Sequence, residues 1–227
     1  MISLVLAFSR FVKMFLGLVV LYLSVKYFGT SFERDSWVLS IALYGVIVCF
    51  LYNPINETFR TKYIFLKEER GEEDAMKSVN SLMNFFNITY LVIALILFVA
   101  VSPITQVLAP GFDLTKREFL SIMIFTLIPY FIFQQQGNIL VALLNTYESY
   151  FYPELVSLLA SLINILSILF LSEYIGIYSL VVATTLNGLI LVSVLSHMLR
   201  KRVPSFREPM SLSLCFVFVR KKIIFVN

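Results

Sequence analysis

The chain has 227 residues, of which 59% are hydrophobic and 14% are charged, and its mean hydropathy is +0.87. Soluble domains average about 45–50% apolar and about 25% charged residues, so this composition excludes an ordinary soluble protein. The net charge of +4 is small, and we expect membrane lipids rather than nucleic acid as partners. Two distant cysteines and a single histidine exclude a disulfide framework and a zinc site.

Six stretches are long and apolar enough to cross a membrane, which takes about 20 residues. They predict an all-α polytopic membrane protein whose six transmembrane helices form one N-terminal domain over residues 1–203. A cationic, apolar first segment with no cleavage site indicates a mature helix rather than a signal peptide. The predicted helices span about 4–28, 36–56, 81–106, 119–145, 153–172 and 175–199.

Residues 204–227 form a tail whose apolar run, 210–219, is too short to span a bilayer. We interpret it as the truncated start of a seventh helix or as a reading-frame artefact. The sequence does not decide between the two.

Lys and Arg residues predict the orientation, because they accumulate in cytoplasmic loops. Five lie in the 57–80 link and four follow the sixth helix, nine in all, against four in the remaining loops. Both termini are therefore expected in the cytoplasm. The charged, aromatic 57–80 link is expected either to lie along the inner membrane surface or to form a solvated loop.

Two cations, Arg10 and Lys13, lie in the first helix, where a charge at the bilayer centre costs about 2.5–3.5 kcal/mol. One interpretation is that they snorkel to the inner interface. The other is that they face a cavity and attract an anion. The first helix offers no acidic partner, and Asp35 and Glu57, which bracket the second helix, are the rival protein partners.

Polar residues recur at helical spacing in five of the six segments, so each set lies on one helix face. They predict either interhelical hydrogen bonds or the lining of a water-filled cavity. In the second case Asn87, Asn138 and Asn187 are candidate substrate-binding residues. Pro103, Pro129 and Gly137 are candidate flexible points. The sets are Arg10, Lys13, Gly17 and Ser24; Asn80, Asn84 and Asn87; Gln134, Asn138 and Asn145; Ser157, Ser161 and Asn164; and Ser179, Ala183 and Asn187.

Motifs of enzymes are missing from the sequence: it has no P-loop, no HExxH and no GxSxG. Its main acidic cluster, "EERGEED" at 68–74, lies in a Lys-rich link and indicates solvation rather than magnesium binding. We therefore expect no catalytic residue, cofactor or metal site, and the chain is not expected to be an enzyme.

Four short motifs occur in order along the chain: "FSR" at 8–10, "YFGTSFERDSW" at 27–37, "LAPGF" at 108–112 and "ALLNTYESYFYPEL" at 142–155. Together they resemble the N-terminal half of the MurJ/MviN lipid II flippases, within the multidrug, oligosaccharidyl-lipid and polysaccharide exporter superfamily. The resemblance covers about residues 5–203. It implies one lobe of a two-lobe, roughly fourteen-helix exporter in the bacterial inner membrane.

The resemblance also implies a function: outward transport of an undecaprenyl-pyrophosphate-linked saccharide such as lipid II, by alternating access. In that family, arginines in the cavity hold the pyrophosphate. Ser9 and Arg10 match the family's Ser-Arg pair, and Asp35 matches an acidic residue of the family. Lys13 has no clear counterpart. Val48 and Cys49 stand where the family has an Arg pair, which leaves a Wzx-like polysaccharide or O-antigen flippase as an alternative.

The sequence is also compatible with a drug or ion antiporter of the same superfamily, and with a non-transporting membrane scaffold or truncated remnant. The second lobe implied by the resemblance is absent from these residues. We expect it from a continuation of the same chain, from a separate chain or from a homodimer.

Overall fold

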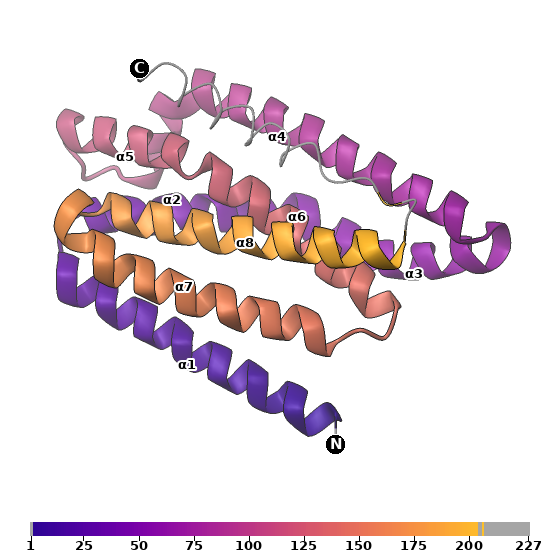
Figure 1. Cartoon of the computed structure of the whole chain (residues 1–227). Helices are drawn as coiled ribbons and strands as arrows, with labels where there is room; N and C mark the ends of the chain where they lie inside the picture. Colours follow the sequence, from indigo (N-terminus) through magenta and orange to yellow (C-terminus); the bar gives the residue numbers. More distant parts are fainter. Residues whose placement is uncertain (1, 204–205, 207–227) are drawn as a thin grey trace, which may run out of the picture.

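The computed structural model describes residues 2–203 and residue 206, so all but Phe206 of the expected tail lies outside the described residues. The described part is built from helices that run along one bundle (Figure 1). They are α1 (Ile2–Phe28), α2 (Phe32–Ile47), the π-helical turn η1 (Val48–Tyr52), α3 (Asn53–Arg70), α4 (Glu72–Leu108), α5 (Leu114–Thr126), α6 (Ile128–Thr146), α7 (Phe151–Ile175) and α8 (Tyr178–Arg202).

Five segments of the described chain are long and apolar enough to cross a membrane, one fewer than the sequence predicts. The difference concerns the helix predicted over 36–56. There α2 ends at Ile47, and the chain passes through η1 directly into α3. This π-helical turn, η1, ends two residues before Pro54. The five segments are 6–28, 72–108, 114–146, 151–175 and 178–202.

The 57–80 link is helical throughout except at Gly71, whose φ of 88° ends α3 and allows the chain to reverse into α4. In Figure 1, α3 runs beside the first part of α4 rather than across the end of the bundle, as a helix lying on the membrane surface would. Phe59 and Tyr63 of α3 are buried, as are Ala75 and Met76 of α4. At about 1.5 Å per residue, the 37 residues of α4 extend about 55 Å, well beyond a hydrocarbon core of about 30 Å.

A polar cluster around Tyr147, which caps the end of α6, joins that helix to α3 and α4. The Tyr147 hydroxyl lies 2.6 Å from Glu72 Oε1, to which it donates, and 2.6 Å from the Tyr63 hydroxyl. Burial raises the pKa of both tyrosines, and the hydrogen bond to Glu72 raises the pKa of Tyr147 further, so Tyr147 remains a donor. The Lys67 Nζ lies over the Tyr147 ring, 4.3 Å from its centroid, and forms an ion pair with Glu72 Oε1 at 3.2 Å.

The helix predicted over 119–145 is divided into α5 and α6 at Leu127. Pro129 has no N–H to donate to the Phe125 carbonyl, and Leu127 caps α5 instead, through its N–H to Met123 O at 3.2 Å. Pro129 therefore begins a new helix, a position that proline tolerates. Pro103, by contrast, lies inside an uninterrupted α4.

Close packing of α6 on α8 forms the centre of the bundle. A Cβ at Gly137 would lie 2.6 Å from Leu191 Cδ2, and one at Gly188 would lie 3.0 Å from Phe133 Cβ. These glycines let the two helices approach, which explains Gly137 by packing rather than by flexibility. Outside this pair, α7 packs on α8 and α1 packs on α7 (Figure 1).

The chain reverses direction at each end of the bundle, whereas α2 continues into α3 and α5 continues into α6 without a reversal. The start of α1, the α3–α4 hairpin, the α6–α7 connection and the end of α8 all lie at one end (Figure 1). The α1–α2, α4–α5 and α7–α8 connections lie at the other end. We call these the hairpin end and the opposite end.

Candidate functional site

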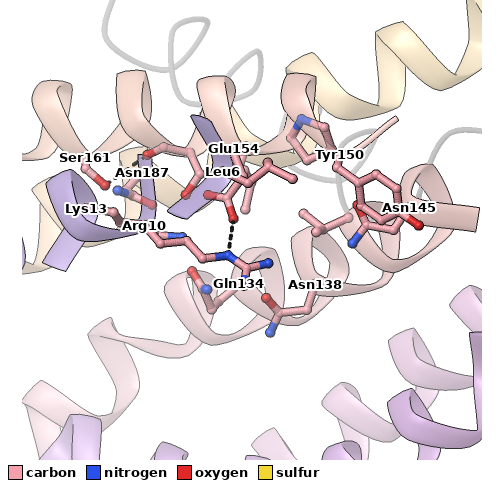
Figure 2. Close-up of a pocket in the computed structure, with 14 residues that line it drawn as sticks. Leu6, Arg10, Lys13, Gln134, Asn138, Asn145, Tyr150, Glu154, Ser161 and Asn187 are labelled. Carbon is pink, nitrogen blue, oxygen red and sulfur yellow. Dashed lines mark hydrogen bonds and ion pairs between the residues drawn. The ribbon is translucent and has the colours of Figure 1, made fainter. Parts of the chain in front are cut away.

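A pocket of about 260 Å³ opens between α1, α6, α7 and α8, toward the hairpin end of the bundle (Figure 2). Each helix contributes side chains from one face, spaced three or four residues apart, as helical periodicity requires. Most of the lining is polar, and two cations and one carboxylate are included. The lining residues are Leu6, Arg10, Lys13, Gln134, Asn138, Val141, Asn145, Tyr150, Pro153, Glu154, Ser157, Ser161, Asn187 and Leu191.

Arg10 extends from α1 into this pocket and forms an ion pair with Glu154 of α7, with Nε 3.3 Å from Oε1. Of the rival partners that the sequence suggests, Asp35 is not in this pocket but lines another hollow. The terminal amino groups of Arg10 make no hydrogen bond to a described residue. The guanidinium lies between Glu154 on one side and Gln134 and Asn138 on the other (Figure 2).

Lys13 lies one turn further along α1 and lines the same pocket. No ion pair joins it to a described residue. With Arg10 and Lys13 against Glu154, the formal charge of the lining is +1. The pocket is therefore attractive to anions, and the amide and hydroxyl groups around the cations supply further hydrogen bonds.

The predicted polar stripes are brought together in part. Asn138 of α6 and Asn187 of α8 both line the pocket with Arg10 and Lys13, although α6 and α8 are far from α1 in sequence. Asn87 does not line the pocket: its Oδ1 accepts a hydrogen bond from Gln136, between α4 and α6. The stripe on α4 thus contributes an interhelical contact, and those on α1, α6, α7 and α8 contribute pocket lining.

Asp35 lies elsewhere, at the opposite end of the bundle. It lines an open hollow of about 450 Å³ between the first turn of α2 and the loop after α4. That loop carries the "LAPGF" stretch, of which Leu108, Ala109, Gly111 and Phe112 line the hollow. Asp35 and Arg10 therefore belong to separate cavities.

Glu154 is the pocket residue that sequence reasoning missed. It lies in the first turn of α7, where the helix dipole stabilises a carboxylate. An acidic residue at that position is therefore common and does not by itself indicate a binding site. Only the pairing with Arg10, 144 residues away, marks it as part of the site. Gln134 belongs to a predicted stripe but not to the predicted binding residues, and the stripe itself is the signal that could have identified it.

This arrangement is suited to binding an anion. Arg presents a planar fork that can hold phosphate oxygens in a bidentate manner, and Lys adds a point charge. Among the described residues, no group of three or more His, Cys, Asp or Glu side chains is placed to hold a metal ion.

Comparisons with known proteins identify the family and the fold. The protein-family model described as "Lipid II flippase MurJ" matches residues 24–215. A search of curated proteins found no match. A solved structure titled "Lipid II flippase MurJ, inward closed conformation" superposes with a TM-score of 0.68 at 23% identity, covering 84% of this chain and 41% of that one. The chain therefore spans less than half the length of that flippase. Since the family match extends over most of its residues, the chain belongs to the MurJ lipid II flippase family.

Proposed function

We propose that this chain forms one lobe of a lipid II flippase in the bacterial inner membrane, and that Arg10 and Lys13 bind the pyrophosphate of the lipid-linked saccharide. The observation that carries the proposal is the pocket in which these two cations of α1 meet Asn138 of α6 and Asn187 of α8. The cations match the charge of a pyrophosphate. The neutral amides match the hydrogen-bonding groups of sugars.

The location of the pocket supports loading from the cytoplasm. It lies toward the hairpin end, where Arg200, Lys201 and Arg202 end α8 and Lys67 and Arg70 end α3. Cations gather on the cytoplasmic side of membrane proteins, so we assign the hairpin end, where α1 begins and α8 ends, to the cytoplasm. In this orientation the α2–η1 segment, 32–52, also crosses the membrane, which together with the five apolar spans makes six passes in a domain that covers residues 1–203.

The membrane potential would assist release on the outer side. Moving about two negative charges outward across about 100 mV, inside negative, releases roughly 4–5 kcal/mol. A second lobe would complete the cavity, since this chain spans only 41% of the flippase that it resembles in structure. A continuation of the chain, a separate chain and a second copy are the possible sources of that lobe.

The decisive variant is Arg10→Glu, introduced at the native locus. It places a second carboxylate beside Glu154 and reverses the charge that is meant to hold pyrophosphate. We expect the loss of lipid II from the outer leaflet, with a normal amount of protein in the membrane. The readout is the accessibility of lipid II to an external lipid II-cleaving toxin.

The matched control is Lys26→Glu, which reverses a charge near the C-terminal end of the same helix and outside the pocket. It should transport normally. Normal outer-leaflet lipid II in the Arg10→Glu strain would show that this pocket is not the pyrophosphate site.

A further inference from the structure

We propose that Glu154 is an internal counter-anion that competes with the incoming pyrophosphate for Arg10 and thereby lowers the affinity of the pocket. This inference rests on the proposed function, because it takes the same pocket and the same ligand class. It adds a specificity-determining residue that lies on α7, not on the cationic helix α1.

The geometry of Glu154 supports exchange rather than a permanent structural bond. Its contact with Arg10 is a single one, of 3.3 Å, and it leaves the terminal amino groups of Arg10 available. The other carboxylate oxygen, Oε2, is buried and has no hydrogen-bond partner among the described residues. Glu154 is thus held in the pocket mainly by the charge of Arg10.

The charges around the pair determine the sign of the effect. The titratable and charged side chains lining the pocket are Arg10 and Lys13 from α1, Glu154 from α7 and Tyr150 from the connection before it, while α6 and α8 contribute none. An anion that approaches Arg10 must either displace Glu154 or lie beside it. Both events are unfavourable, because one leaves a half-buried carboxylate without its cation and the other places like charges together.

A consequence is that removing an acidic residue, and not a basic one, should tighten binding. Glu154→Gln keeps the shape of the side chain and retains an oxygen that accepts from Arg10, but it removes the competing charge. We expect roughly twofold to fivefold tighter binding, because the Arg10 side chain of this ion pair is 72% exposed and exposed ion pairs contribute little.

The experiment measures binding of farnesyl pyrophosphate, a soluble prenyl pyrophosphate, to the full chain purified in detergent. Wild type, E154Q, R10Q and K13Q are compared, and E173Q serves as the matched control. Glu173 is exposed near the other end of the same helix, so E173Q should bind as wild type does. Monodisperse elution in gel filtration establishes that each variant is folded.

Weaker binding by R10Q together with tighter binding by E154Q supports the inference. Weaker binding by R10Q with unchanged or weaker binding by E154Q overturns the role of Glu154 and leaves the proposed function intact. Wild-type binding by both R10Q and K13Q overturns the site itself.

Should E154Q fail to elute as a single species, E154A provides the test. It also removes the competing charge, so the affinity should again rise. An affinity at or below that of wild type would overturn the inference.

Discussion

At the scale of single residues, charge and size have separate roles in this bundle. Charge is concentrated at Arg10, Lys13 and Glu154, which share one pocket. Size matters most where α6 crosses α8, because glycine there replaces side chains that would keep the helices apart. Both features depend on a few side chains, so single substitutions should reveal them.

Gly137→Ala should destabilise the protein. The added Cβ would lie 2.6 Å from Leu191 Cδ2 and 3.3 Å from Leu191 Cγ, so Leu191 must shift within a packed interface. Overpacking of this kind typically costs about 1–3 kcal/mol. A lower thermal unfolding midpoint in detergent, followed by fluorescence, is the expected result.

Gly45→Ala is the control for this prediction. Gly45 lies in α2 with no atom within 4 Å of the added Cβ, and replacing a helical glycine with alanine commonly stabilises by about 0.5–1 kcal/mol. Its midpoint should stay the same or rise. A Gly137→Ala protein as stable as Gly45→Ala would contradict the close approach of α6 and α8.

At the scale of helices, the polar stripes divide into two kinds. Those of α1, α6, α7 and α8 each contribute at least one residue to a common pocket, whereas Asn87 of α4 accepts a hydrogen bond from Gln136 of α6. The same residue type at the same helical spacing therefore lines a cavity in one place and joins two helices in another. Only the neighbouring helix decides which of the two occurs.

Cysteine labelling should separate these two kinds of stripe. In a background with Cys49 and Cys215 replaced by Ser, Asn138→Cys and Asn187→Cys should react with a water-soluble maleimide, because the pocket is open to water. Asn87→Cys should react far more slowly, because that position lies against α6.

Two further positions calibrate the labelling. Ser196→Cys replaces a side chain that is 1% exposed and sets the protected limit, and Glu73→Cys, on the exposed hairpin, sets the reactive limit. If Asn138→Cys and Asn187→Cys react with the maleimide as slowly as Ser196→Cys does, all these stripes form interhelical contacts and none lines a cavity.

At the scale of the whole molecule, the alternating helices place their connections at two ends of the bundle (Figure 1). The hairpin end carries the basic ends of α3 and α8, and the opposite end carries Asp35 and the loop after α4. This asymmetry of charge is what orients a membrane protein during insertion.

The proposed orientation predicts which end a membrane-impermeant reagent reaches. In the same cysteine-free background, Glu173→Cys, near the opposite end, should be labelled in intact spheroplasts. Glu73→Cys, on the hairpin, should be labelled only after the membrane is opened. The reverse pattern would place the hairpin end outside, and labelling of both positions in intact spheroplasts would contradict a six-pass bundle.

The amino-acid sequence by itself determined the helical membrane class, most helix positions and the family. These features are local, because about 20 consecutive apolar residues suffice to define a span, and short motifs in order suffice to define a resemblance. Where local chemistry acts at a single residue, as at Pro129, the sequence indicated a flexible point, but not that the helix would divide there into α5 and α6.

The tertiary structure alone decided which polar residues meet. Arg10 and Glu154 are separated by 144 residues, and no helical periodicity relates α1 to α7. Asp35 is a second example. It lies only seven residues after the end of α1, which carries Arg10, but it lines a different hollow at the opposite end of the bundle. Periodicity defines the face of a helix, whereas the packing of one helix against another decides what that face contacts.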